Sequence, residues 1–307
     1  MEYINSKNDK CFRLLNLYER FNRGERLSKY DMMELYGVSE KSVKRDISDL
    51  RSYIANMHDI DTTLLYDRNT KLYYLGKLHR EWFESEEIIS ICKILLESRA
   101  LNAQEMNIVL QKLINQTIPQ EQDEVKDILM NELSCYIPLC HGKELLSPIW
   151  DFTTYINHKK KVEITYQRQD LTCKSHTIKP VALMFSEFYF YVIAFLDQEE
   201  KRYPTTFRLD RILRYEDINE YFVPPYYSDF NEGEFRKRVQ FMYAGPLKHF
   251  VFKYSGPSVE AVLDRLPTAT IIDQKDGVYT ISAQSYGNGI KMWLNMRKEY
   301  VEIVEEK

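Results

Sequence analysis

The sequence is poor in the residues and patterns that common enzyme motifs require. Only 10 of its 307 residues are glycine, and neither a P-loop nor a dinucleotide-binding glycine pattern is present. A nucleophile elbow and the H-E-x-x-H zinc pattern are also absent. Adjacent acids such as Glu86-Glu87 and Glu199-Glu200 are more typical of solvated surface than of a catalytic pair. We therefore expect no catalytic residues, no cofactor and no enzyme activity.

Cysteines are few, and long apolar runs are missing. The five cysteines are scattered and odd in number, which argues against a disulfide framework. The group Cys135-x4-Cys140-His141 lacks the spacing and the partner cluster of a zinc site, so we expect no metal. No segment reaches the roughly 18 apolar residues of a membrane span, and the first residues lack the apolar core of a signal peptide. The chain is predicted to be cytoplasmic, with no membrane partner.

The charge is distributed unevenly along a chain that is long enough for two or three domains. The net charge is −4, but residues 1–80 carry 15 Lys and Arg against 12 Asp and Glu, whereas residues 81–145 carry 5 against 12. A mildly basic head before an acidic segment is compatible with specific DNA binding, because such binding requires only a local basic face.

Residues 1–80 contain three helical patterns separated by turn residues. Ser28, followed three residues later by Asp31, is a capping pattern that predicts the start of the second helix. This helix is expected to stop at Gly37. Ser39 is a suitable N-cap for a third helix over residues 40–56.

The third helix has the layout of a DNA-recognition helix. Its apolar residues recur at i, i+4, i+7 and i+11 on one face, and basic and hydroxyl residues lie opposite them or on the flanks. The apolar face of such a helix packs on the domain, while the other face reaches base edges and phosphates. The apolar stripe is Val43, Ile47, Leu50 and Ile54, and the predicted DNA-binding residues are Ser39, Lys41, Ser42, Lys44, Arg45 and Ser48.

A hairpin is predicted directly after this helix, from β-prone runs at residues 63–66 and 72–75. A hairpin in this position is a wing, and Arg68 and Lys71 at its tip are candidate phosphate contacts. The alternative is a generic three-helix bundle with a solvated basic face. The stretch VSEKSVKRDISDLR resembles the recognition helix of DeoR-type winged helix-turn-helix regulators, in which a hydroxyl residue followed by Arg-Asp-Ile is typical. The resemblance implies a winged helix-turn-helix domain that binds double-stranded DNA.

Residues 81–145 are predicted to form a helical linker. Ser85-Glu86-Glu87 places acids at a helix start, and three apolar stripes at helical spacing follow. Because helix breakers are few, we expect this segment to connect domains or to form the interface of a homodimer. The third stripe consists of Val125, Ile128, Leu129 and Leu133.

The hydrophobic pattern changes from helical to alternating in residues 146–219. A short helix at residues 147–158 is followed by five predicted strands. A short helix before a string of strands predicts a small Sm- or SH3-like β-barrel. The strands are expected at residues 162–167, 176–183, 188–195, 203–209 and 214–217.

This segment resembles the WYL domain of bacterial regulators over nearly its whole length. The matching features are Ile164-Thr165-Tyr166, Lys179-Pro180 before a strand, and the closing sequence TFRLDRI at residues 206–212. The sequence departs from the family at its namesake Trp-Tyr-Leu, which is Phe190-Tyr191-Val192 here. The resemblance implies a sensing domain whose positively lined pocket accepts a nucleotide, single-stranded nucleic acid or another anion.

Several polar residues of this segment can hold an anion through guanidinium, hydroxyl or imidazole groups. Strand alternation places Arg208 and Asp210 on the face opposite Phe207 and Leu209. The alternatives are a structural Arg208–Asp210 ion pair, a histidine without a ligand role and a tyrosine at the rim of the core. The predicted ligand-binding residues are Tyr166, His176, Tyr191, Arg202, Arg208 and Arg211.

The last segment, residues 236–307, follows a linker at Val223-Pro224-Pro225. Its pattern predicts the β-α-β-β-α-β order of a ferredoxin-like fold, preceded by a β segment near Phe241. It resembles the C-terminal extension often found behind WYL domains, which implies roles in dimerisation and in transmission of the ligand signal.

Together these segments predict an α+β multidomain chain with a winged helix-turn-helix (1–80), a helical linker (81–145), a WYL domain (146–219) and a ferredoxin-like extension (236–307). The predicted function is a homodimeric, DNA-binding transcription regulator whose WYL domain senses an anionic effector and modulates DNA binding. The alternative is a nucleic-acid-binding or protein-interaction module that acts in DNA-damage or phage-defence signalling.

Overall fold

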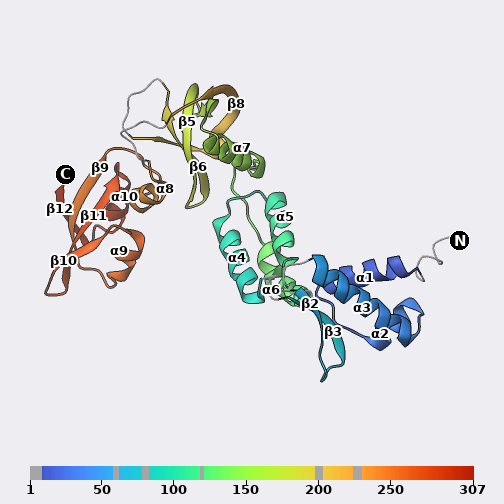
Figure 1. Cartoon of the computed structure of the whole chain (residues 1–307). Helices are drawn as coiled ribbons and strands as arrows, with labels where there is room; N and C mark the ends of the chain where they lie inside the picture. The colour runs from blue at the N-terminus through green and yellow to red at the C-terminus, as the bar shows by residue number, and fades with distance from the viewer. Residues whose placement is uncertain (1–8, 58–61, 78–82, 118–120, 198–202, 224–229) are drawn as a thin grey trace. The chain divides into compact units, whose positions relative to one another are not determined.

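The computed structural model describes residues 9–57, 62–77, 83–117, 121–197, 203–223 and 230–307. The chain divides into two compact units, one of residues 1–97 and 106–136 and the other of residues 98–105 and 137–307. Helices and three separate sheets make up these units (Figure 1). This composition confirms the predicted α+β class, while the division into four domains stays a prediction.

The head consists of three helices and a small sheet (Figure 1). Helix α1 (Lys10–Asn22) is followed by the short strand β1 (Leu27–Ser28), helix α2 (Lys29–Tyr36) and helix α3 (Glu40–Met57). Strands β2 (Thr62–Tyr66) and β3 (Leu72–Lys77) form a hairpin, and β3 also pairs with β1. The predicted stripe of α3 is buried in the head core, which includes Leu17, Phe21, Met32, Val43, Ile47, Leu50 and Ile54.

Local signals in the sequence explain where α2 and α3 begin and where α2 ends. The backbone N–H of Asp31 donates to the Ser28 hydroxyl at 3.1 Å, and the Ser28 N–H donates to the Asp31 carboxylate at 2.7 Å, which completes a capping box. Gly37 ends α2 with a φ of 64°, a left-handed value that glycine adopts at little cost. At the start of α3, the Ser42 N–H donates to the Ser39 hydroxyl at 3.3 Å. These three predictions are confirmed.

One ion pair is buried inside the head. Arg13 of α1 donates from Nε to Oδ2 of Asp46 on α3 at 2.9 Å and from Nη2 to Oδ1 at 3.3 Å. The two side chains are only 8% and 3% exposed. Three residues away on each helix, Lys10 and Asp49 form an exposed counterpart at 2.7 Å. Two ion pairs of very different burial therefore join α1 to α3.

Helices α4 (Ser85–Ser98), α5 (Ala103–Ile114) and α6 (Gln122–Ser134) form the predicted helical segment. Their most buried residues are Ile88, Cys92, Met106, Leu110, Val125 and Leu129. Ile128, expected in the apolar stripe of α6, is 48% exposed, so this detail of the prediction is wrong. Val125 and Leu129 are one helical turn apart and fill the buried face between them, which leaves Ile128 on the side of the helix.

A buried carboxylate caps helix α7 (Leu146–Asn157) from a distant position in the sequence. Glu105 near the start of α5 accepts hydrogen bonds from the backbone N–H groups of Leu145 and Leu146 at 2.9 and 2.8 Å. The N–H groups of a first helical turn have no acceptor within their own helix, and the positive end of the helix dipole favours a carboxylate. Glu105 therefore attaches α5 to the start of α7.

The middle sheet contains five antiparallel strands. They are β4 (Lys160–Gln167), β5 (Cys173–Ser186), β6 (Tyr189–Leu196), β7 (Thr205–Arg208) and β8 (Ile212–Tyr221), in the order β7-β6-β5-β4-β8. Within the described residues, no pairing of β7 with β8 closes this sheet, and the predicted Sm- or SH3-like barrel is not found there. A 3-10 turn at Leu209–Arg211 separates the two strands instead. Helix α7 covers β4 and β5.

The C-terminal sheet follows the predicted β-α-β-β-α-β order. Its elements are β9 (Leu247–Tyr254), α9 (Glu260–Arg265), β10 (Thr270–Lys275), β11 (Val278–Tyr286), α10 (Gly289–Met296) and β12 (Val301–Glu306). The strands pair in the order β10-β11-β9-β12, and every pairing is antiparallel. A core that includes Phe250, Phe252, Val262, Ile281 and Trp293 lies between the two helices and one face of this sheet.

Helix α8 (Glu232–Arg238), which the sequence pattern did not predict, joins the middle sheet to the C-terminal sheet. Phe235 packs with Met184 and Ile193 of the middle sheet and stacks on Tyr286 of β11, with 5.2 Å between the ring centroids. Arg238 donates from Nε to Oε1 of Gln284 on β11 at 3.3 Å.

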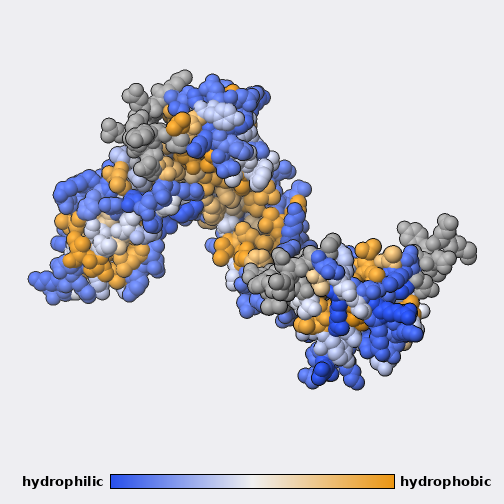
Figure 2. All heavy atoms as spheres, viewed as in Figure 1, coloured by the Kyte–Doolittle hydropathy of each residue, from blue (hydrophilic) through white to orange (hydrophobic). Residues whose placement is uncertain are grey.

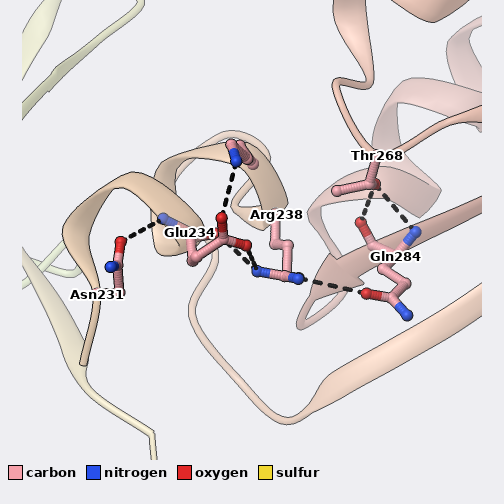
Figure 3. Close-up of polar contacts among 6 residues, drawn as sticks. Asn231, Glu234, Arg238, Thr268 and Gln284 are labelled. Atoms are coloured by element: carbon pink, nitrogen blue, oxygen red, sulfur yellow. Dashed lines mark hydrogen bonds and ion pairs between the residues drawn. The ribbon is translucent and has the colours of Figure 1, made fainter. Parts of the chain in front are cut away.

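Polar contacts hold α8 in place (Figure 3). The Asn231 side chain accepts the Glu234 N–H at 2.9 Å and caps the helix, and Glu234 pairs with Arg238 one turn later. The β segment expected near Phe241 is reduced to an isolated bridge between Val239 and Tyr286 of β11. Phe241 and Met242 adopt left-handed φ values of 50° and 54° instead and make a turn.

Among the residues that the structure describes, no helix combines the length and the hydrophobicity that crossing a membrane requires. In the same ranges, no three His, Cys, Asp or Glu residues come together in a group able to hold a metal ion. All five cysteines are free thiols, and Cys92 alone is buried.

Candidate functional site

The exposed face of α3 presents basic and hydroxyl side chains. Lys41, Arg45 and Ser48 are exposed and Ser42 is half-buried, whereas the apolar stripe on the opposite face is buried. Asp46 lies between Arg45 and the core residue Ile47, and its carboxylate is occupied by Arg13. Because this acid is withdrawn from the surface, the exposed face keeps the positive potential of its lysines and arginine.

The basic residues of α3 are not equivalent. Lys44 pairs with Glu40 one turn earlier at 2.9 Å, and this hydrogen bond raises the pKa of Lys44. Arg51, on the flank, donates from Nε to the carbonyl oxygen of Leu64 at 3.0 Å and so attaches α3 to β2. Neither Lys41 nor Arg45 forms an ion pair within the described ranges. We therefore rank Lys41 and Arg45 above Lys44 as contacts for phosphates or bases.

Two serines that the sequence predicts as DNA contacts are hydrogen-bonded to each other. The Ser39 and Ser42 hydroxyl oxygens lie 3.1 Å apart, and Ser39 also caps α3. Ser39 thus has a structural role at the helix start, where free N–H groups also suit a phosphate.

The tip of the β2–β3 hairpin is polar and exposed (Figure 2). The Asp67 carboxylate accepts the backbone N–H of Asn69 at 2.8 Å, which shapes the turn and lowers the pKa of Asp67. Lys71 has a φ of 61°, and both Arg68 and Lys71 are exposed. The turn therefore presents two cations away from the head core, as a phosphate-contacting wing requires.

A second polar cluster lies on the middle sheet around Arg208. Its guanidinium carbon is 3.4 Å from the ring centroid of Tyr189, a cation–π contact. Tyr191 is the neighbour of Arg208 across the β6–β7 pairing, and burial raises the pKa of the Tyr191 hydroxyl. The Arg208 backbone N–H donates to the Tyr166 hydroxyl at 3.4 Å. Three of the six predicted ligand residues, Tyr166, Tyr191 and Arg208, thus come together.

The Arg208 guanidinium already has a carboxylate partner. It donates from Nε and Nη2 to the two oxygens of Asp210 at 3.0 and 2.7 Å. Asp210 is buried because the chain turns into a 3-10 helix after Arg208, so the predicted strand alternation of residues 208–210 is wrong. The structural ion pair, left open as an alternative, is therefore present. An incoming anion must share Arg208 with Asp210 or displace it.

The other predicted ligand residues lie outside this contact set or outside the described residues. The His176 ring lies 5.8 Å from that of Phe207, which itself contacts Tyr166. Arg211 is half-buried in the 3-10 turn, with no ion pair in the described ranges. Arg202 is not among the described residues.

Two residues near Arg208 were missed from the sequence. Tyr189 shares a strand face with Tyr191, so strand alternation was a signal that could have found it. His141 precedes α7, and the charges of Asp210 and Arg208 act on its imidazole. Its Nδ1 accepts the Lys143 N–H at 3.1 Å, its Nε2 is buried without a partner in the described residues, and burial lowers its pKa. Nothing local in the sequence signals this position.

Residues 151–217 match the family model of the WYL domain. The match confirms the WYL resemblance predicted from the sequence, and it covers the second half of α7 and most of the middle sheet. In the WYL domain, the residues that replace the namesake Trp and Leu keep their apolar role. Val192 is fully buried and Phe190 packs on Phe185 with ring centroids 5.2 Å apart, while Tyr191 faces the Arg208 cluster.

Two solved structures show distant likenesses to the chain. Proteasome accessory factor B/C (PafBC) of Arthrobacter aurescens is 15% identical, with 95% of this chain and 44% of that chain covered and a TM-score of 0.30. A CRISPR Cas-related protein is 10% identical, with 98% of this chain and 79% of that chain covered and a TM-score of 0.25. The chain thus spans less than half of the PafBC chain, and such TM-scores support neither a shared fold nor a shared function. No curated protein sequence matches this chain.

Proposed function

We propose that the protein is a non-enzymatic, sequence-specific DNA-binding transcription regulator whose WYL domain senses an anionic ligand. The observation that carries the proposal is the surface of α3, where Lys41 and Arg45 are exposed and free of ion pairs in the described ranges while the adjacent Asp46 is buried. A helix that packs by one face and presents arginine, lysine and serine on the other fits the major groove of DNA.

The order of elements in the head supports the same reading. Three helices followed by a hairpin make a winged helix-turn-helix, with α3 as the recognition helix and the β2–β3 hairpin as the wing. Arg68 and Lys71 at the tip are positioned for backbone phosphates, which determine register but carry no sequence information.

For the sensing function, the Arg208 cluster is the binding site that we propose. Arginine binds carboxylate and phosphate groups through two parallel hydrogen bonds, and Arg208 holds Asp210 in this manner. A phosphate-bearing nucleotide or single-stranded nucleic acid competes with Asp210 for the guanidinium, and its base stacks on the neighbouring tyrosines. Asp210 then acts as an internal counter-ion that keeps the site neutral until the ligand arrives.

Homodimerisation is part of the proposal because the helical segment (α4–α6) exposes large apolar side chains. Ile94 of α4, Ile108 of α5 and Ile128 of α6 are 70%, 42% and 48% exposed. Exposed apolar groups of this kind favour an interaction surface. A dimer of this regulator recognises a two-fold symmetric DNA site, since the symmetry of the site follows that of the protein.

The test is selection of bound duplexes from genomic fragments, followed by sequencing. We expect the protein to enrich one short, two-fold symmetric motif, and the Lys41→Ala/Arg45→Ala variant to lose this enrichment. The matched control is Lys112→Ala/Lys126→Ala, which removes the same charge from exposed positions of the helical segment and is expected to enrich the same motif.

Enrichment that survives Lys41→Ala/Arg45→Ala contradicts the role of α3. Preferential capture of single strands, unaffected by that variant but lost in Arg208→Gln, favours the other hypothesis, in which the WYL domain itself is the nucleic-acid-binding module.

A further inference from the structure

A small cavity lies where the turn between β5 and β6 meets α8 and the end of α9. Its volume of about 160 Å³ has room for roughly five water molecules at about 30 Å³ each. Typical sites for drug-sized ligands measure about 300–1,000 Å³, so this cavity suits a small group. Its polar lining consists of Ser186, Glu187, Arg236, Gln240 and Arg265, none of which belongs to the Arg208 cluster.

The lining contains two guanidinium groups and one carboxylate. Arg265 donates from Nη2 to Oε1 of Glu187 at 2.7 Å. Arg236 donates to the backbone carbonyl oxygen of Phe185 at 3.3 Å and pairs with no acid in the described ranges. The lining therefore carries an excess positive charge, which attracts an anion.

The hydrogen bonding of Arg265 is incomplete. Its Nε is buried without an acceptor among the described residues, and its guanidinium carbon lies 4.8 Å from the centroid of the Phe241 ring. A buried donor without an acceptor destabilises a protein, and in folded proteins such groups usually have a partner such as ordered water or a bound ion. An anion in the cavity supplies an acceptor that Glu187 alone does not.

The backbone around the cavity is strained. Nine non-glycine residues in the described chain have positive φ values, and three of them, Glu187, Phe241 and Met242, line this one cavity. Non-glycine residues adopt this conformation at a cost, and such residues concentrate at ligand sites.

We propose that this cavity binds a phosphate group, held by Arg236 and Arg265 at the joint between the WYL sheet and the C-terminal sheet. The cavity shares Glu187, Phe241 and Arg265 with an open groove of about 490 Å³ that continues past Trp293 and Arg297. The phosphate is supplied either by inorganic phosphate or by a nucleotide whose remainder lies in that groove.

The test is a calorimetric titration of the full chain with inorganic phosphate at constant ionic strength. We expect saturable binding that Arg265→Met and Arg236→Gln each weaken roughly tenfold or more, as the loss of a charge-assisted hydrogen bond implies. Arg236 is exposed, so its variant is expected to fold even if Arg265→Met does not. The matched control is Lys237→Gln, which removes a neighbouring charge that does not line the cavity and leaves binding unchanged.

Glu187→Gln gives the sharpest test because its expected effect on phosphate affinity is opposite to that of the two arginine variants. Removing the carboxylate that competes for Arg265 is expected to tighten phosphate binding, whereas a purely structural role of the Glu187–Arg265 pair predicts weakening. Arg208→Gln must leave the binding intact, which separates this site from the proposed sensing site.

The proposal is overturned by absence of saturable binding, by equal losses in Lys237→Gln and Arg236→Gln, or by weaker binding in Glu187→Gln. A titration with a nucleoside monophosphate then identifies the source: tighter binding than that of inorganic phosphate assigns the groove to a nucleotide, and equal or weaker binding assigns the cavity to the free ion.

Discussion

The two ion pairs between α1 and α3 allow a stability prediction with an internal control. Asp46→Ala removes one partner of the buried Arg13–Asp46 pair, whose side chains are 8% and 3% exposed. The guanidinium is then left buried without its carboxylate, and such a change costs about 3–5 kcal/mol. At 1.4 kcal/mol per factor of ten, the head opens roughly two to three and a half powers of ten more often. Asp49→Ala removes the exposed Lys10–Asp49 pair from the same helix, with the same gain in helix propensity, and is expected to change little.

The measurement is hydrogen exchange of α1 and α3 peptides in the full chain, because exchange reports the opening of one region without unfolding the rest. We expect strongly accelerated exchange in Asp46→Ala and near-original exchange in Asp49→Ala. The double variant Arg13→Met/Asp46→Leu replaces both charges by apolar groups and is expected to recover most of the protection. Equal exchange in Asp46→Ala and Asp49→Ala, or no recovery in the double variant, would refute the argument that an uncompensated buried charge destabilises the head.

Three further predictions concern other parts of the chain. Arg45→Ala should weaken binding to the selected DNA site by roughly 1–3 kcal/mol and relax the discrimination between that site and other sequences. Arg68→Ala should weaken binding to all duplexes alike and reduce the slope of log affinity against log salt concentration by about one. Unchanged affinity of both variants contradicts the docking of α3 and the hairpin on DNA. Burial raises the pKa of the Cys92 thiol to about 11, so a thiol reagent at pH 7.5 should modify the other four cysteines quickly and Cys92 only after unfolding; rapid modification of all five contradicts the packing of α4. Burial lowers the pKa of His141 below its usual 6.5, so the stability due to its neutral form is complete above about pH 6.5 and is lost as the pH falls through the lowered value. In urea unfolding, His141→Gln should therefore lose less free energy of unfolding between pH 7.5 and 5.5 than the original protein does. The control is His158→Gln at an exposed position, which should keep the original loss.

Most of the fold could be predicted because its elements depend on local patterns. The capping box at Ser28, the left-handed Gly37 and the alternating burial along β5 are each determined within a few residues, and the structure reproduces them. The closure of the middle sheet was not predictable in this manner, because the relation of β7 to β8 depends on how residues 209–211 turn. Helix α8 escaped prediction because it is short and its buried residue, Phe235, packs on two different sheets.

The candidate sites follow the same division between local and distant information. Helical periodicity alone identified the exposed face of α3, and strand pairing placed Tyr191 beside Arg208. His141 lies far from Arg208 in the sequence, and the Arg265–Glu187 pair joins residues 78 positions apart. No periodicity or motif connects such residues, so only the three-dimensional arrangement reveals them.

Two arginine–aspartate sequences show why a motif residue is not always a contact residue. In Arg45-Asp46-Ile47 the three side chains point in different directions: Arg45 to the surface, Ile47 into the core, and Asp46 to Arg13 of another helix, 33 positions away. In Arg208-Leu209-Asp210 the acid meets an arginine only two positions away, because a 3-10 turn brings them together. Both aspartates are buried and both neutralise an arginine, but with different consequences. Asp46 neutralises a core arginine and leaves Arg45 charged for DNA, whereas Asp210 neutralises the arginine that we assign to the ligand, so an Asp210→Asn change should strengthen anion binding where Asp46→Asn only weakens the fold.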